Sequence, residues 1–425
     1  MTPIGIATLA IPTLGFLALG YYRRSWAIAV FCALLPVYLI RLKLGFPGLP
    51  EIPSTFLEVL FAAIFVPWFF GRGLRPESWA GLRRWAIPIT LILTGSAIGI
   101  LVSPDRLGGL GLWRAYFLEP ILFFAVFTDT VRVSKDRAAV LAGMAVSLAA
   151  IALTAVFQKF TGYGIPDPWW TASVRRVTSF YGFPNAIGLY LAPIVVLVSA
   201  WAADLFFRPG GRRRPWPYLL AVVAVLGFLA CLFAVSKGAL IGMAVALAVY
   251  GLSVRRLRPL ALTAVIAVCL AVSLYRPLTS LAGNIFAGRD ASSSVRLVIW
   301  NETLNMLSDR PIFGGGLSGY RQSVEPYHRA GHIELFMYPH SLPLNLWTEI
   351  GLIGLVGFVW LLVLFFVRNI RVARRGRSWL PTALLSAMVC ILIHGLVDVP
   401  YLKNDLAFQF WILVGLAESL TVYEI

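Results

Sequence analysis

The sequence predicts an all-α polytopic membrane protein, and three observations lead to that fold class. First, the chain of 425 residues is 59% hydrophobic and only 13% charged, with a mean hydropathy of +0.81, which excludes an ordinary soluble globular protein. Second, its charged residues separate apolar runs of about 17 to 25 residues, the length of an α-helix that crosses about 30 Å of hydrocarbon. Third, the alternating pattern of a β-barrel is absent, so helices must satisfy the backbone hydrogen bonds in lipid.

These runs predict about 12–13 transmembrane helices in a single integral membrane domain, residues 1–425. We find no internal repeat, low-complexity linker or soluble nucleotide-binding unit in the sequence. The run from Pro3 to Tyr22 lacks a charged leading region and a cleavage pattern of small residues, so we interpret it as a helix rather than a signal peptide. The runs lie near residues 3–22, 26–44, 54–71, 85–103, 107–128, 138–158, 183–207, 216–235, 237–252, 259–275, 342–367, 380–400 and 405–421.

The net charge of +17 raises the question of a nucleic-acid partner, but the distribution of the charge favours a membrane explanation. Arg and Lys residues cluster in every second connection between the runs, which is the pattern of cytoplasmic loops. We therefore expect no nucleic-acid partner, an N-terminus outside the cell membrane and a C-terminus inside. The clusters are Arg23 and Arg24; Arg72, Arg75, Arg83 and Arg84; Arg132, Lys135 and Arg137; Arg208 and Arg212 to Arg214; Arg255, Arg256 and Arg258; and Arg368, Arg371, Arg374, Arg375 and Arg377.

The same alternation puts the one long polar stretch, residues 276–341, on the outer (periplasmic or extracytoplasmic) face. A large loop of Arg, Gly and His residues beside a bundle of apolar helices suggests chemistry at a membrane surface. Gly314, Gly316 and Gly319 in this loop form GxGxxG, but the motif follows a polar turn rather than a strand, so we expect no dinucleotide site. A Walker-type GK[ST] sequence is missing, and the four cysteines lie inside apolar runs, where we interpret them as packing residues.

Three elements on the expected outer face carry the chemical argument. The first is RRVTSFYGFPNAIGLYLAP, from Arg175 to Pro193, in which two arginines precede an aromatic turn that leads into a membrane helix. The alternative, with equal weight, is a pair of arginines that reach lipid headgroups between interfacial aromatic residues. Because Arg175 and Arg176 face outward, against the positive-inside bias, we expect an anion to compensate their charge.

The second element is Arg296. Ser292 to Ser294 offer an N-cap for a predicted helix from Val295 to Leu307. A cation in the first helical turn opposes the helix dipole, whereas an anion is favoured there by free N–H groups. A phosphate held between the helix end and the forked guanidinium would explain an arginine at this position. The alternative is a surface salt bridge to Asp290 or Glu302.

The third element is His340, which lies just before a predicted membrane helix. Histidine titrates near neutrality, so His340 is the natural general base for a hydroxyl nucleophile. The alternative is a structural histidine at the interface. His328 and His332 are weaker candidates because neither abuts a membrane helix, and the three histidines lack the HExxH or Cys pattern of a zinc site, so we expect no metal.

A series of motifs follows in order from about residue 170 to residue 420. They are RVTSFYGFPNAIGLYL (Arg176 to Leu191), VSKGALIG (Val235 to Gly242), SVRLVIW (Ser294 to Trp300), RPIFGGGLSGY (Arg310 to Tyr320), PHSLPLNLWTEIGLIGLVGF (Pro339 to Phe358) and HGLVDVPYLKNDLAFQFWILVGL (His394 to Leu416). In this order, with a large outer loop before the final helices, they resemble the O-antigen ligase and O-antigen polymerase superfamily. Each motif is degenerate singly, and the specificity comes from their order.

The resemblance implies a GT-C-like membrane glycosyltransferase that is inverting, metal-independent and free of cofactors. Its donor would be a glycan on a polyprenyl (undecaprenyl) pyrophosphate carrier, and its acceptor would be lipid A-core in a ligase or another lipid-linked glycan in a polymerase. The resemblance implies that Arg176 and Arg296, with Arg175 beside them, bind the pyrophosphate. His340 would activate or orient the acceptor hydroxyl, and Asp398 matches an acidic position of less clear role. One span more than the family's usual twelve leaves the first helix unexplained.

Two questions stay open at this point. The ionisable residues Glu58, Arg114 and Glu119 lie within apolar runs, where they either support a lipid carrier between helices or pair with one another. A transporter or flippase of lipid-linked glycans is the rival from another class. A transporter should carry its polar site near the membrane midplane, whereas this sequence gathers polar residues in one outer loop, which favours an enzyme.

Overall fold

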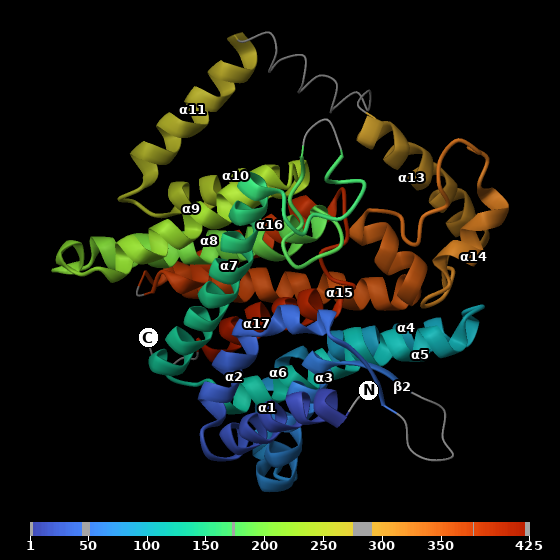
Figure 1. Cartoon of the computed structure of the whole chain (residues 1–425), viewed down its shortest axis with the longest axis horizontal. Helices are drawn as coiled ribbons and strands as arrows, with labels where there is room; N and C mark the ends of the chain where they lie inside the picture. Colours follow the sequence, from blue (N-terminus) through green and yellow to red (C-terminus); the bar gives the residue numbers. More distant parts are fainter. Residues whose placement is uncertain (1–2, 45–51, 172–174, 275–290, 377, 421–425) are drawn as a thin grey trace.

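The computed structural model of the chain describes residues 3–44, 52–171, 175–274, 291–376 and 378–420. These residues form a bundle of helices with one short hairpin (Figure 1). The helices are α1 (Pro3–Tyr22), α2 (Arg24–Ala33), α3 (Phe56–Trp68), α4 (Ala86–Val102), α5 (Arg106–Leu112), α6 (Glu119–Thr130), α7 (Ser134–Thr161), α8 (Asn185–Phe207), α9 (Trp216–Phe233), α10 (Lys237–Ser253), α11 (Arg258–Leu274), α13 (Ala291–Asp309), α14 (Tyr320–Val324), α15 (Leu342–Arg374), α16 (Leu380–Gly395) and α17 (Asn404–Ser419).

The predicted all-α membrane class is confirmed. Seven helical stretches of the described chain are long and apolar enough to cross a membrane, and five shorter apolar helices accompany them. The long stretches are Phe56–Gly73, Pro76–Val102, Arg106–Thr130, Ser134–Thr161, Asn185–Phe207, Trp216–Phe233 and Leu342–Arg374. The shorter ones are Ala10–Tyr22, Arg24–Ala33, Lys237–Ser253, Arg258–Ala271 and Leu380–Gly395.

The predicted span near 26–44 is wrong beyond Ala33. Pro36 has no N–H to continue an α-helix, and the chain passes into a 3-10 turn at Leu35–Leu39. It then forms strand β1 (Arg41–Leu44), which pairs antiparallel with β2 (Ile52–Thr55). The apolar run continues beyond the end of α2, so its length overestimated the length of the helix.

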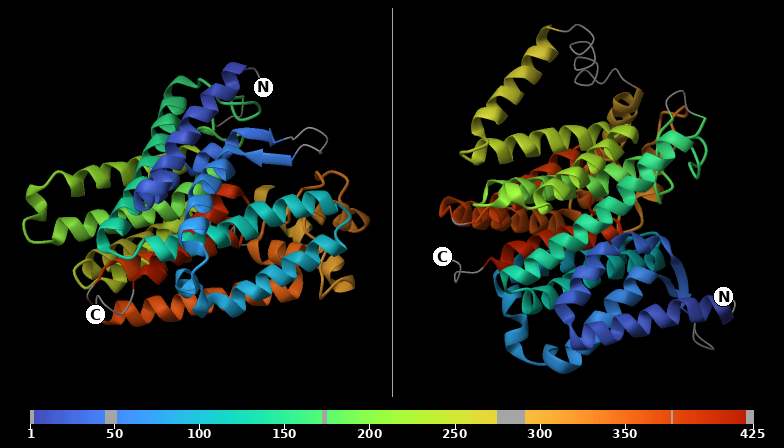
Figure 2. Two further views of the ribbon diagram at one scale, coloured as in Figure 1. Left: turned by 90° about the horizontal axis from the view of Figure 1, so that it is seen from below. Right: turned by 60° about the vertical axis from the view of Figure 1, so that its left-hand side comes forward.

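Helices α8 and α17 occupy the centre of the bundle. Almost every residue of α17 is buried, and its Phe408 makes edge-to-face or tilted ring contacts with Phe31, Phe61 and Phe123 of α2, α3 and α6. At the periphery, α9 leaves many of its apolar side chains exposed and α11 leaves most of them exposed, and α11 reaches away from the bundle in the right-hand view of Figure 2. The turn that enters α17 is consequently held by the best-packed part of the molecule.

The basic clusters gather at one end of the bundle, which agrees with their predicted placement on one side of a membrane. Arginines from different loops bind the same carboxylates, or backbone carbonyls close to them. The contacts are Arg72 with Asp129 (2.9 Å), Arg132 with Asp129 (2.7 Å), Arg84 with Glu418 (3.5 Å), Arg368 with Glu418 (3.6 Å) and Arg137 with the Ser419 carbonyl (3.0 Å). We call this the basic end.

Glycines allow a loop to pass close to the pair α4 and α15. Helix α15 is interrupted at Gly351, where φ is +65° and ψ is −176°, and the N–H of Leu352 donates to the Ile312 carbonyl across the break. Gly314 has a φ of +68°, and a Cβ there would lie 2.5 Å from the carbonyl oxygens of Trp347 and Thr348. The glycines of the GxGxxG sequence therefore serve close backbone packing.

Gly314→Ala should destabilise the protein, because alanine would have to adopt a left-handed backbone and clash with two carbonyls. We expect a cost of about 1–3 kcal/mol, seen as a lower midpoint of thermal unfolding in detergent. Gly331→Ala is the control, since a Cβ there meets nothing within 4 Å. Equal midpoints for the two variants would contradict this account of the loop.

Candidate functional site

Polar segments that are far apart in the sequence meet at the end of the bundle opposite the basic end (Figure 1). The membrane helices that meet the site (α8, α9, α10, α15, α16 and α17) have their other ends at the basic end, so the two ends are separated by the length of the bundle. Helix α8, with 23 residues, spans roughly 35 Å at 1.5 Å per residue. The segments are the loop before α8, the α9–α10 turn, α13, the start of α15 and the α16–α17 connection.

Arg176 lies in the loop before α8 and is half-buried. Its Nε donates to the Ala234 carbonyl at 2.9 Å, and its Nη2 donates to Asn185 Oδ1 at 3.0 Å. Its guanidinium also faces the Trp169 ring, 5.0 Å from the centroid. Burial lowers the pKa of Arg176 from its ordinary value, yet an arginine remains charged at neutral pH. The structure thus holds a fixed, partly dry cation at this point.

The loop that carries Arg176 is anchored by Gln158 near the end of α7. The Gln158 side chain accepts from the N–H groups of Thr178 (3.0 Å) and Ser179 (2.7 Å), and it donates to the carbonyls of Gly164 (3.2 Å) and Ser179 (3.0 Å). Ser179 has a left-handed φ of +52°, an unfavourable conformation that these bonds maintain. A buried amide therefore fixes the backbone beside Arg176.

Asp398, in the α16–α17 connection, is the shared partner of the site. It is 2% exposed, it accepts from Asn185 Nδ2 at 3.4 Å, and its Oδ1 lies 3.5 Å from His340 Nδ1. Burial alone raises the pKa of a carboxyl, but His340, His394 and the Val399 N–H outweigh that effect and lower the pKa of Asp398 to about 2. Asp398 is consequently a carboxylate at neutral pH.

His340 lies immediately before α15 in a left-handed conformation, with φ of +48°. Its ring contacts Tyr338 at 4.5 Å and Phe336 at 5.1 Å between centroids, and its side chain is 17% exposed. Strained backbone of this kind costs on the order of 1–3 kcal/mol and is typical of functional positions. The conformation presents an imidazole beside the Asp398 carboxylate, with part of its surface still open.

Arg296 is brought to the same place by α13. Trp300 of that helix donates from Nε1 to the carbonyl of Pro339 at 2.9 Å, which ties α13 to the residue before His340. Burial and the charge of Asp398 raise the pKa of Tyr338, while the charge of Arg296 lowers it. Arg296 is therefore close enough to Tyr338 for their charges to interact. The Nε of Arg296 is buried and has no hydrogen-bond acceptor among the described residues.

Helix α13 already includes Ala291, four residues before the predicted start at Val295. Arg296 Nη1 donates to Ser292 Oγ at 2.6 Å. Side chains four residues apart meet on one face of a helix, so this bond stabilises helical structure at Ser292 to Ser294, where an N-cap was predicted. Arg296 is therefore in the second turn, and the first-turn dipole argument does not apply to it. The predicted alternative of a salt bridge to Glu302 is wrong, because His328 Nδ1 (3.0 Å) and the Arg329 N–H (2.9 Å) bind that carboxylate. Asp290 and the rest of 276–290 lie outside the described residues.

Lys403 is a site cation that the sequence analysis missed. It lies in the same connection as Asp398, with its Nζ 4.0 Å from the centroid of the Phe183 ring. That Nζ is buried and has no hydrogen-bond acceptor among the residues described. Burial lowers the pKa of Lys403, while the charges of Asp405 and Asp398 oppose this effect. The available signal was a lysine in an outward connection, the same departure from the positive-inside rule that singled out Arg176.

The remaining predicted residues lie apart from this cluster. Arg175 stacks on Trp170, 4.1 Å from the ring centroid, and contacts the Lys159 carbonyl at 3.5 Å. Arg114 pairs with Glu58 at 2.6 Å and Glu119 at 3.4 Å, which confirms the alternative that these three pair with one another. In the described chain, no three His, Cys, Asp or Glu side chains are placed to hold a metal ion.

The geometry has a definite chemical capacity. Arg176, Arg296 and Lys403 place positive charge around one end of the bundle, and two of them keep unused buried donors. Such donors favour an anion with several oxygen atoms, because an unpaired buried donor costs about 1–3 kcal/mol. His340, beside Asp398, adds an imidazole whose ring nitrogens can accept and donate a proton.

Comparison with known families agrees with the resemblance found in the motifs. Residues 222–359 match a family model described as O-antigen ligase. The matched segment runs from α9 into α15, so it includes Arg296 and His340 and lies between the segments that carry Arg176 and Asp398. No curated protein matches the chain.

Gln158→Met should loosen the Arg176 loop while it preserves the volume of the side chain. The variant leaves the N–H groups of Thr178 and Ser179 without their partner, at about 1–3 kcal/mol for each buried group. We expect faster amide hydrogen exchange in residues 176–181, measured by mass spectrometry. Thr154→Ala is the control, since that hydroxyl bonds only a carbonyl of its own helix. Unchanged protection in Gln158→Met would refute the anchoring role.

Proposed function

We propose that the chain, whose residues 222–359 match the O-antigen ligase family, is a membrane glycosyltransferase of that superfamily that uses polyprenyl pyrophosphate-linked glycan as donor. It transfers the glycan from undecaprenyl pyrophosphate to an acceptor hydroxyl, in the ligase type of reaction a hydroxyl of lipid A-core. One observation carries this proposal: Arg176, Arg296 and Lys403 lie around the buried Asp398–His340 pair, and Arg296 Nε and Lys403 Nζ are buried donors without an acceptor among the described residues.

The cations are suited to a pyrophosphate. Arg176 is already fixed by Ala234 and Asn185, whereas Arg296 Nε and Lys403 Nζ keep donors that phosphate oxygens can satisfy. A guanidinium binds phosphate through a planar fork, and a partly dry site strengthens each contact relative to water. Arg175, stacked on Trp170, contributes long-range positive charge rather than a direct contact.

The reaction follows from this arrangement. The acceptor oxygen attacks the anomeric carbon from the face opposite the carrier, and the glycosyl–phosphate C–O bond breaks. The electron pair of that bond goes to the pyrophosphate, and the hydroxyl proton goes to His340. The configuration at the anomeric carbon is inverted, and polyprenyl pyrophosphate leaves. The arginines stabilise the leaving group most in the transition state, where its charge has grown, so they raise the rate and not only the affinity.

Asp398 supports His340 in this scheme as a positioning residue. Its carboxylate, 3.5 Å from Nδ1, favours the imidazolium that forms when His340 takes the proton. Because the pKa of Asp398 is lowered to about 2, the carboxylate keeps its charge throughout the physiological range. The same carboxylate orients Asn185, which in turn binds Arg176. Asp398 therefore positions both the arginine that binds the glycan donor and the histidine that acts on the acceptor hydroxyl.

The basic end supports an extracytoplasmic location of the site in the plasma (inner) membrane. By the positive-inside rule the basic end faces the cytoplasm, and the site lies at the other end of the same helices. The gathering of polar groups at one end also favours a transferase over a flippase, which needs its site near the midplane. A polymerase of the same superfamily would use the same donor site with a second lipid-linked glycan as acceptor.

Substitutions separate donor binding from proton transfer. His340→Ala should bind the lipid-linked glycan with unchanged affinity but lose about 10²–10⁴ in turnover, the usual contribution of a general base. Arg296→Lys should lose most transfer although its charge is kept, because lysine lacks the fork. Donor affinity in nanodiscs and single-turnover transfer to lipid A-core or to a second lipid-linked glycan are measured side by side, so the acceptor is identified in the same assay.

The matched control is Arg329→Lys, a charge-conserving change at an exposed arginine in the same polar stretch, for which we expect normal transfer. Loss of donor affinity in His340→Ala as large as that in Arg176→Ala would move His340 into the phosphate site. Normal transfer by Arg296→Lys would remove Arg296 from it.

A further inference from the structure

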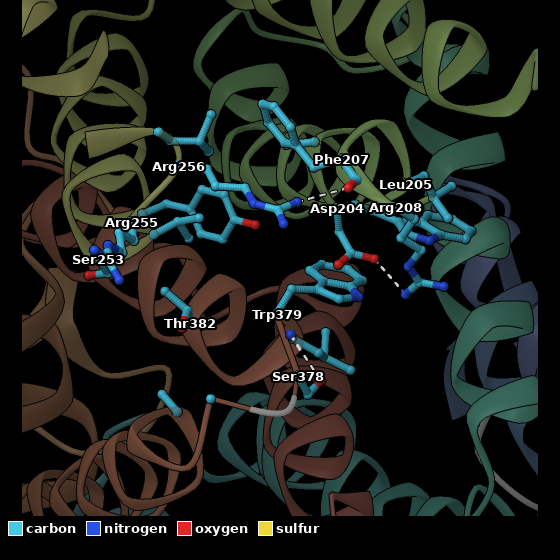
Figure 3. Close-up of a pocket in the computed structure, with 18 of the residues that line it drawn as sticks. Asp204, Leu205, Phe207, Arg208, Ser253, Arg255, Arg256, Ser378, Trp379 and Thr382 are labelled. Carbon is cyan, nitrogen blue, oxygen red and sulfur yellow. Dashed lines mark hydrogen bonds and ion pairs between the residues drawn. The ribbon is translucent and has the colours of Figure 1, made fainter. Parts of the chain in front are cut away.

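A polar pocket lies at the basic end (Figure 3), and the helices that form it carry the candidate site at their other ends. Its volume is about 1060 Å³. It is formed where α7 begins, where α8 and α10 end, and where the α15–α16 connection passes, so four separate elements converge on it. The transferase reaction proposed above does not use this pocket.

Positive charge dominates the lining. Arg137, Arg208, Arg255 and Arg256 line the pocket, and Asp204 is the one acidic residue among the lining side chains. Arg208 pairs with Asp204 at 2.5 Å, so this carboxylate is already engaged. Arg256 donates to the Phe207 carbonyl at 2.9 Å, and neither Arg255 nor Arg256 has an acidic partner among the described residues. The pocket is therefore complementary to an anion.

The other side chains of the lining suit a polar group at a membrane interface. Trp201, Tyr250 and Trp379 supply aromatic walls, and Ser378 and Thr382 supply hydroxyl groups. Tryptophan and tyrosine are enriched at the level of lipid headgroups, where one end of the side chain is apolar and the other is wet. The combination of arginines with interfacial aromatic residues favours a phosphate that is attached to a lipid.

An apolar groove continues from this pocket. A second cavity of about 780 Å³ shares Trp201, Leu205 and Arg208 with the first. Its remaining walls are mostly apolar and come from α7, between Ala142 and Ala149, and from the first turns of α9, with Pro209, Gly211 and Arg214 of the α8–α9 connection at the edge. A basic, aromatic pocket that opens into an apolar groove between two helices matches an amphiphile with a charged head and a hydrocarbon chain.

We propose that this composite site binds an anionic phospholipid of the cytoplasmic leaflet. The phosphate lies among Arg208, Arg255 and Arg256, and an acyl chain lies in the groove between α7 and α9. Basic pockets at the cytoplasmic ends of membrane helices bind such headgroups through the same chemistry. The lipid joins α7, α8 and α10 to the α15–α16 connection, and these helices also carry the candidate site at their other ends.

The test counts lipid molecules retained by the full-length protein in native mass spectrometry. Detergent-purified protein is mixed with dioleoylphosphatidylglycerol or with zwitterionic dioleoylphosphatidylcholine. We expect preferential retention of the phosphatidylglycerol, and a loss of about 10-fold or more in its apparent affinity when Arg255→Gln and Arg256→Gln are combined. Arg75→Gln with Arg83→Gln removes the same charge from exposed positions at the basic end outside the pocket, and this control should retain the lipid.

Two further arms keep the proposal testable. Arg255→Lys with Arg256→Lys keeps the charge and should retain more phosphatidylglycerol than the glutamine pair, which separates binding from misfolding. Soluble glycerophosphate at millimolar concentration should not displace the lipid, because it lacks the chain that occupies the groove. Equal retention by the glutamine pair and the control pair would overturn the proposal. Full displacement by glycerophosphate would also overturn it and would identify a site for free phosphate compounds.

Discussion

The buried carboxylate of Asp398 is the constraint on which the site depends. A charge that is 2% exposed is costly unless charged or hydrogen-bonded partners compensate it, and here the partners come from two other segments and from its own connection. Asn185 and His340 contact the carboxylate directly, and its charge stabilises the charged form of Lys403. Arg176 is connected to it through Asn185. The packing of α17 fixes the turn that carries this carboxylate, so the position of the site depends on the packing of the core.

The two ends of the bundle hold arginines for different physical reasons. At the basic end, many cationic side chains share carbonyls and a few carboxylates, which is what a polar interface with anionic lipid requires. At the site end, a few cations are half-buried and keep unused donors, which is unfavourable without an anionic ligand. The presence of an arginine therefore does not show whether it marks the cytoplasmic side or binds a ligand. Its burial and its hydrogen-bond partners do.

The sequence predicted the fold class, most helices and the polar segments that meet at the site, because hydrophobic run length and turn residues are local properties. It misjudged the run near 26–44, where Pro36 ends the helix and a hairpin follows, and the start of α13, where Arg296 bonds back to Ser292. It missed Lys403 and did not distinguish the surroundings of Arg175 from those of Arg176, since burial and partner choice depend on segments far apart in the sequence. Arg175 and Arg176 are adjacent in sequence, yet only Arg176 is bonded to the residues around Asp398.

The central claim is that the pyrophosphate-linked glycan is cleaved at this site as it is transferred. The most direct measurement follows free polyprenyl pyrophosphate in nanodiscs that contain purified protein, lipid-linked glycan donor and acceptor lipid, without nucleotide and with a chelator present. We expect one free polyprenyl pyrophosphate to appear for each glycan transferred, and this release to stop when the acceptor is omitted. Movement of the donor with its glycan–pyrophosphate bond intact, and no release of the free carrier, would contradict the account and identify a transporter.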